Sequence, residues 1–191
     1  QWLVEGVPVD NPHHFATMGN TGAIFPVINN NLLEKSDFIN GALSAQYGNV
    51  YSGVFDVRMR RGNNERHEFA AQLSSWGAEV VAEGPFKKKG ASYGLTFRTG
   101  IFDLLQLANI DLGTNAIPRY YDLNFKIDLP TDQAGHFSIF GIGGLSNTAI
   151  LAADADTSDL FAEFDNDLYI YTGLGLLGLK HKKFLNKTSS L

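Results

Sequence analysis

Residues 46–62 read Q-Y-G-N-V-Y-S-G-V-F-D-V-R-M-R-R-G and lie between two different kinds of sequence. Successive side chains of a strand point to opposite faces, so the alternation here predicts a strand with one apolar and one charged face. The apolar set is Tyr51, Phe55, Val57 and Met59, with Gly53 among them, and the charged set is Asp56, Arg58 and Arg60. Short segments rich in Gly, Pro and Asn precede this stretch, whereas longer alternating runs follow it. We therefore interpret it as the boundary between two structural units.

The chain after residue 64 alternates repeatedly between apolar and polar residues, which predicts about six antiparallel strands. In the clearest of them the apolar side is formed by Tyr121, Leu123, Phe125, Ile127 and Leu129, and the polar side by Tyr120, Asp122, Asn124, Lys126 and Asp128. A tilted strand of about nine to eleven residues crosses a bilayer, and short turns alternating with long loops are typical of outer-membrane barrels. The same alternation also fits a soluble antiparallel sandwich, so the pattern leaves both architectures open.

The overall composition narrows the class of protein. Of the 191 residues, 18% are charged, which is below the share of about 25% that is usual in soluble domains. No apolar run reaches the roughly 18 residues of a membrane-spanning helix, although alternating barrel strands would not produce such a run. The net charge of -5 argues against nucleic acid as a partner. The absence of Cys excludes disulfides and thiolate metal sites.

Several short motifs resemble one family. The segment V-E-G-V-P-V at residues 4–9 resembles the D-G-V-P-V segment in the plug domain of TonB-dependent outer-membrane receptors, with Glu5 in place of the usual Asp. The runs G-A-L-S-A-Q-Y-G-N at 41–49 and S-G-V-F-D-V at 52–57 are similar to the last plug strands of that family. The runs E-G-P at 83–85 and F-G-I-G-G-L-S at 140–146 resemble early barrel strands of its carboxypeptidase-regulatory-like, SusC-related branch. The resemblance extends over nearly the whole chain.

This resemblance implies an all-β fold, namely a segment of a plugged antiparallel transmembrane β-barrel. Residues 1–64 would be the C-terminal part of the plug domain, and residues 65–191 the N-terminal strands of the outer-membrane barrel. Plugged outer-membrane transporters have about 22 strands, and about six strands cannot surround a plug. We therefore expect the barrel part to be incomplete, with its edges paired by the remainder of the same barrel.

The resemblance also implies a function in the cell outer membrane. The protein would be a receptor for the active import of a scarce nutrient, such as a siderophore or an oligosaccharide. Its expected partners are a TonB-type energy-transducing protein, outer-membrane lipid, a surface lipoprotein and the small-molecule or glycan ligand. The five His residues lie beside no nucleophile elbow and no carboxylates at metal-ligand spacing. We therefore predict no enzymatic activity, no catalytic or cofactor-binding residues and no cofactor.

Three polar clusters are candidates for a role in binding. Asp154, Asp156 and Asp159 form an oxygen-rich run that suits calcium, although the Gly and Glu of an EF-hand are missing and we favour a solvated acidic loop. The adjacent His13 and His14 would point to opposite faces of a strand, so we favour a polar loop over a metal site. The arginines at positions 58, 60 and 61, together with Asp56, suggest charge pairs between plug and barrel wall.

Two other functions compete with import: a soluble β-sandwich that binds glycans, and a calcium-binding adhesin module. The direction of the apolar face separates these hypotheses. In a barrel, Phe125 and its apolar neighbours face lipid, while Asn124 and its polar neighbours face the lumen. In a sandwich, the apolar face that carries Leu123 is buried against a second sheet.

Overall fold

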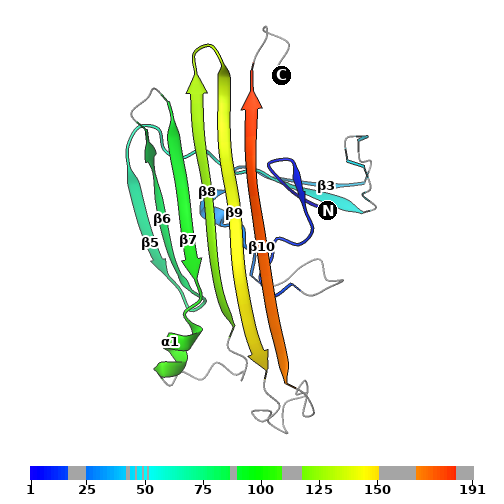
Figure 1. The fold of residues 1–191 in the computed structure, drawn as a ribbon, viewed down its shortest axis with the longest axis vertical. Coiled ribbons are helices and arrows are strands. Elements are labelled where there is room, and N and C mark those ends of the chain that lie inside the picture. Colours follow the sequence, from blue (N-terminus) through cyan, green and yellow to red (C-terminus); the bar gives the residue numbers. More distant parts are fainter. Residues whose placement is uncertain are drawn as a thin grey trace.

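The computed structural model describes residues 1–16, 25–41, 44–45, 47–48, 50, 52–86, 90–108, 118–150 and 167–183, and these residues form two β-sheets (Figure 1). The prediction of an all-β fold is confirmed. Within these ranges the remaining regular structure is a single 3-10 turn, η1 (Asn30–Leu32), and a six-residue helix, α1 (Phe102–Leu107). No described helix has the length and apolarity needed to cross a membrane.

The small sheet contains four strands in the order β2-β1-β4-β3. These are β1 (Trp2–Val4), β2 (Val7–Val9), β3 (Asp37–Asn40) and β4 (Gly53–Val57). Strand β1 runs parallel to β4, and the other two pairs are antiparallel. Glu5 and Gly6 connect β1 to β2 with positive φ angles of 53° and 88°, which is the conformation of a tight two-residue hairpin turn.

The large sheet is an antiparallel meander of six strands that follow one another in chain order. The strands are β5 (Glu68–Leu73), β6 (Ala78–Pro85), β7 (Ser92–Thr99), β8 (Arg119–Thr131), β9 (Gly135–Ile150) and β10 (Leu168–Lys182). Among the described residues nothing pairs with the free edges of β5 and β10, so this sheet is open and does not close into a barrel. Helix α1 lies at one end of the sheet, which we call the α1 end (Figure 1).

The connections differ in length between the two ends of the large sheet. Strand β8 turns into β9 within residues 132–134, and β6 leads to β7 within 86–91, both at the end opposite α1, which we call the short-turn end. At the α1 end, β7 ends and β8 begins with residues 100–118 between them in the sequence, and β9 ends and β10 begins with residues 151–167 between them. The β5–β6 connection at 74–77 is short although it lies at the α1 end. The predicted alternation of short turns and long loops therefore holds for the later connections but not for the first.

The large sheet is apolar on its exposed face, whereas its covered face is polar along β8 and apolar at Phe140 and Ile142 of β9. Phe125 pairs with Leu95 and Gly141 on the outer face, whereas Asn124 pairs with Thr96 and Ile142 on the inner face. The exposed large apolar side chains of the outer face are Phe69, Leu73, Val80, Leu95, Phe97, Tyr121, Leu123, Leu129, Leu145, Tyr169, Tyr171, Leu177 and Leu179. The buried polar residues of β8 are Asp122, Asn124, Lys126 and Asp128. This is the reverse of the usual distribution, in which buried charges are rare unless they are paired.

The apolar core lies between the two sheets. The small sheet and the segments that follow it contribute Val4, Val9, Ile28, Leu32, Val57 and Met59, and the inner face of β9 contributes Phe140 and Ile142. Two inner-face glycines allow this close approach. A Cβ on Gly144 would lie 2.7 Å from a methyl carbon of Val27, and a Cβ on Gly94 would lie 2.8 Å from a methyl carbon of Leu32. Glycine is required at both positions because the small sheet and its loops occupy the space of a side chain.

The stretch at residues 46–62 departs from its predicted pattern. Its strand is limited to β4, and Met59 makes only an isolated bridge to Leu33. The predicted separation into one apolar and one charged face is wrong, because Val54 and Asp56 are both buried on one side, whereas Phe55 on the other side is 39% exposed. Strand β4 pairs on both edges, with β1 and β3. An interior strand of this kind buries residues of both faces, which alternation in the sequence does not reveal.

Candidate functional site

The interface between the two sheets is built from buried hydrogen bonds that run along β8. The Asn124 side chain donates from Nδ2 to the Val27 carbonyl at 3.0 Å and accepts at Oδ1 from the Asn29 amide at 3.3 Å. Residues 25–29 belong to neither sheet, so their backbone groups depend on such partners when they are buried. The polar row of β8, which alternation identified in the sequence, therefore supplies hydrogen-bond partners to the backbone of residues 25–29.

Glu5 joins the small sheet to two strands of the large sheet. Its carboxylate lies 2.8 Å from the Lys126 ammonium of β8 and 3.1 Å from the Lys180 ammonium of β10, and it accepts the Met59 amide at 2.9 Å. Burial by itself would raise the pKa of the Glu5 carboxyl, but Lys126, the Met59 amide and Lys180 together hold that pKa below its ordinary value. The ionised form of Glu5 is therefore favoured in the folded chain.

Arg60 and Arg61 also contact the large sheet. The Arg60 guanidinium donates to both carboxylate oxygens of Glu83 on β6, at 2.7 and 2.9 Å, and this bond raises the pKa of Arg60 above its ordinary value. Arg61 lies 3.8 Å from Asp128 on β8. Arg58 instead pairs with Asp56 of its own segment at 3.0 Å. Two of the three arginines that the sequence suggested thus reach across the interface.

The two adjacent histidines have separate partners. The His14 ring nitrogen Nε2 lies 3.1 Å from Asp122 Oδ2, which also accepts from Arg98 Nε at 2.8 Å. His13 instead bonds the Asn11 side chain at 2.8 Å, and burial together with the neighbouring His14 lowers its pKa. In the described ranges, no group of three or more His, Cys, Asp and Glu side chains is placed to hold a metal ion.

The calcium candidates Asp154, Asp156 and Asp159 lie outside the described residues.

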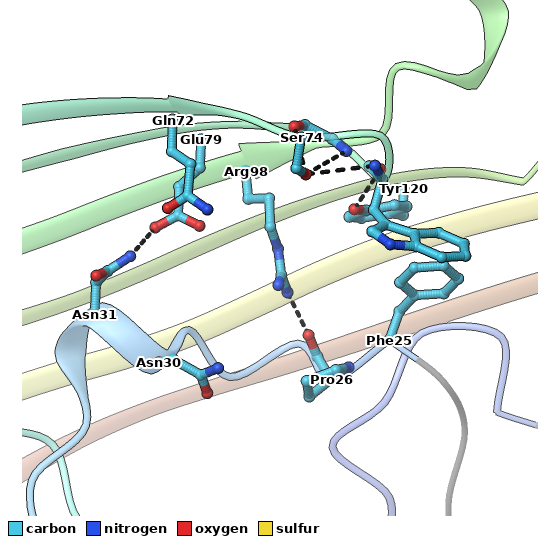
Figure 2. A pocket seen from close by; sticks show the side chains of 11 residues that line it. Phe25, Pro26, Asn30, Asn31, Gln72, Ser74, Glu79, Arg98 and Tyr120 are labelled. Atoms are coloured by element: carbon cyan, nitrogen blue, oxygen red, sulfur yellow. Dashed lines mark hydrogen bonds between the residues drawn. The ribbon is translucent and has the colours of Figure 1, made fainter. Parts of the chain in front are cut away.

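A cavity of about 580 Å³ opens between segment 25–31 and the large sheet, towards the α1 end (Figure 2). Segment 25–31 forms one side of it, and the inner faces of β5 to β8 with the 74–77 turn form the other. Its lining residues are Phe25, Pro26, Asn30, Asn31, Gln72, Ser74, Trp76, Gly77, Glu79, Arg98 and Tyr120. Three of them are aromatic and most of the others are polar, which is a typical mixture for a small-molecule site.

A second cavity, of about 500 Å³, lies at the interface towards the short-turn end and is strongly charged. Its lining includes six cationic and three anionic side chains: Arg58, Arg60, Arg61, Lys126, Lys180 and Lys182, with Glu5, Glu34 and Asp128. Most of these groups are engaged in the ion pairs described above, either with one another or, for Arg58 and Arg60, with Asp56 and Glu83. The α1-end cavity is therefore lined mainly by aromatic and uncharged polar groups, whereas the cavity at the short-turn end is lined mainly by charged groups.

Sequence reasoning selected none of the residues of the α1-end cavity as ligand-binding. They come from five separate segments, and no spacing in the sequence connects them. The only available signal was alternation, which sets Gln72 and Ser74 on the side of β5 opposite Phe69 and Leu73. Compared with models of known protein families, with curated proteins and with solved structures, the chain matches none of them. Functional interpretation therefore rests on geometry and on the motifs quoted above.

Proposed function

We propose that this chain is the plug end and the first barrel strands of a TonB-dependent outer-membrane receptor that imports a scarce nutrient. The small sheet, within residues 1–64, belongs to the plug, and the large sheet, within residues 65–191, is the beginning of the barrel wall. The remainder of the same barrel pairs with the free edges of β5 and β10. A TonB-type protein supplies the energy for transport by acting on the plug.

One observation carries this proposal: the large sheet exposes an apolar outer face, while the polar row of β8 is buried on the inner face. Leu177 on the outer face is 74% exposed, whereas Asn124 on the inner face is fully buried. Exposing so much apolar surface to water is unfavourable by about 25 cal/mol per Å². A barrel strand meets lipid with this face and the lumen with the other, which fits the distribution.

The contacts between the sheets support the same proposal. A plug that has to rearrange inside a rigid wall is better held by polar groups than by a continuous apolar core, because polar groups can exchange partners with water. Within the described part of the chain, the main apolar cluster between the sheets contains eight buried residues, and the hydrogen bonds of Asn124, Glu5 and Arg60 lie beside it. The longer connections gather at the α1 end, which corresponds to the extracellular side of an outer-membrane barrel.

Cell fractionation and surface labelling test this function. We expect the complete gene product to remain with the outer membrane and to need detergent for extraction. The chain contains no Cys, so single cysteines can be placed in α1 as Leu104→Cys and in the short turn as Gln133→Cys. An impermeant maleimide should label intact cells at position 104 and leave position 133 unlabelled. Release into the aqueous phase without detergent, or equal labelling of both positions, would contradict the proposal.

A further inference from the structure

The α1-end cavity carries an exposed aromatic ring that is fixed in position. Trp76 is 57% exposed, although the turn that bears it is well ordered by hydrogen bonds. The hydroxyl of Ser74 accepts from the amides of Trp76 and Gly77, and the hydroxyl of Tyr120 donates to the Trp76 carbonyl at 2.9 Å (Figure 2). The Phe25 ring packs 5.5 Å from the indole. An indole held in this way presents a flat apolar surface, and a ligand that binds to it pays little conformational entropy for ordering the side chain.

Polar groups that lack protein partners line the same cavity. Among the described residues, the side-chain amides of Gln72 and Asn30 have no hydrogen-bond partner and lie exposed, and Figure 2 draws them on facing walls. Glu79 uses one carboxylate oxygen to accept from Asn31. Each amide offers both a donor and an acceptor, and the second oxygen of Glu79 offers a further acceptor. Hydroxyl groups, which also donate and accept, are matched partners for such a set.

The charge of the lining excludes an anionic ligand. Arg98 is the only cation among the described lining residues, and its guanidinium is paired with the buried Asp122 at 2.8 Å. Asp122 neutralises Arg98, and Glu79 adds a negative charge, so the lining carries no net positive charge. Ferric siderophores of the catecholate type carry negative charge and require cationic side chains to offset their desolvation. The cavity at the short-turn end does contain several cationic side chains, but most of them are already in ion pairs with carboxylates of the protein.

We propose that the α1-end cavity binds a neutral segment of a glycan. A sugar ring places its C–H face on Trp76, and its hydroxyls exchange hydrogen bonds with Gln72, Asn30 and Glu79. The volume of about 580 Å³ lies within the usual range of about 300–1,000 Å³ for small-molecule sites. This inference rests on the proposed import function and selects the oligosaccharide from the nutrient classes that the function leaves open.

Isothermal titration of the complete gene product in detergent tests the inference. The probes are neutral hexasaccharides of glucose in α-1,4 and β-1,4 linkage, of xylose and of mannose, together with a ferric tris-catecholate and a neutral hexapeptide. We expect at least one hexasaccharide to bind saturably and the last two probes not to compete with it. Trp76→Ala should weaken binding tenfold or more, Gln72→Ala about threefold to tenfold, and Trp76→Phe less than Trp76→Ala.

A matched control is Phe38→Ala, because Phe38 is also an aromatic residue with 57% exposure but lies on β3 outside the cavity. This variant should bind the hexasaccharide within twofold of the parent protein. The inference is overturned if no neutral hexasaccharide binds, if the ferric chelate or the peptide takes its place, or if Trp76→Ala binds as the parent does. The fractionation and labelling experiments do not depend on the ligand. A protein that passes them but binds only the ferric chelate keeps the import function and loses the glycan site.

Discussion

A half-buried strand in water normally buries its apolar face and exposes its polar face. The two faces of β8 show the reverse. Asp122 and Asn124 on the inner face are 2% and 0% exposed, while Tyr121 and Leu123 on the outer face are 50% and 44% exposed. The inner face is covered because irregular backbone and charged groups of the small sheet need polar partners. The outer face makes no comparable contact in the described part of the chain. The difference teaches that the polar row of β8 is used in contacts with the segments that cover it, whereas its apolar row stays exposed among the described residues.

Removing a charge from the inner face should have the largest effect on stability. Lys126→Ala leaves the buried Glu5 carboxylate with Lys180 as its only cationic partner, and breaking a buried pair costs about 3–5 kcal/mol. Ile127→Ala, one residue further along on the outer face, should cost clearly less. Urea titration of the complete gene product in lipid vesicles measures both free energies of unfolding.

A double variant sharpens this test. Glu5→Gln combined with Lys126→Met removes both buried charges, so we expect it to recover part of the stability that Lys126→Ala loses. If Lys126→Ala is no more destabilising than Ile127→Ala, the inner face does not depend on its ion pairs, and the contrast between the two faces of β8 loses its energetic basis.

Introducing a charge on the outer face is the next largest perturbation. Leu123→Arg should cost about 2–4 kcal/mol if this position lies near the middle of a bilayer. On the surface of a water-soluble protein the same change would stay within about 0.5 kcal/mol. The measurement is the fraction that folds into lipid vesicles, with Leu104→Arg on the exposed side of α1 as the control. Equal folding of both variants would remove the support for a lipid-facing surface.

The sequence predicted the large sheet better than the small one, and the reason is physical. Strand β8 alternates strictly between polar and apolar residues and its neighbours do so in part, so alternation gave the approximate number of strands and the two rows of β8. Strand β4 is surrounded on both edges, and its burial depends on which neighbours cover it. The α1-end cavity depends on contacts between segments as distant as Phe25 and Tyr120, which no local pattern records. Glu5 was visible in the sequence only as a departure from an expected Asp.

A smaller effect is expected from filling the space between the sheets. A Cβ on Gly144 would lie 2.7 and 2.8 Å from the two methyl carbons of Val27 and 2.9 Å from the His14 ring. Gly144→Leu should therefore push segment 25–29 away from the inner face, at a cost of about 1–3 kcal/mol. Gly175→Leu is the matched control, because a Cβ at this outer-face glycine meets nothing within 4 Å. Faster proteolysis of the small sheet in Gly144→Leu alone is the expected result, and equal rates would contradict the close approach.

The smallest expected effect is a dependence of the interface on acid. The pKa of Glu5 is lower in the folded chain than its ordinary value of 4.5, so its contribution to stability is complete above that value. The contribution is lost as the pH falls through the folded pKa, because protonation removes the attraction to Lys126 and Lys180, which stay cationic. Glu5→Gln should lower stability at neutral pH and flatten the loss between neutral pH and pH values below 4.5, whereas Glu34→Gln should keep that loss. Urea midpoints recorded across this pH range compare the variants. An unchanged acid dependence in Glu5→Gln would contradict the assignment of this loss to Glu5.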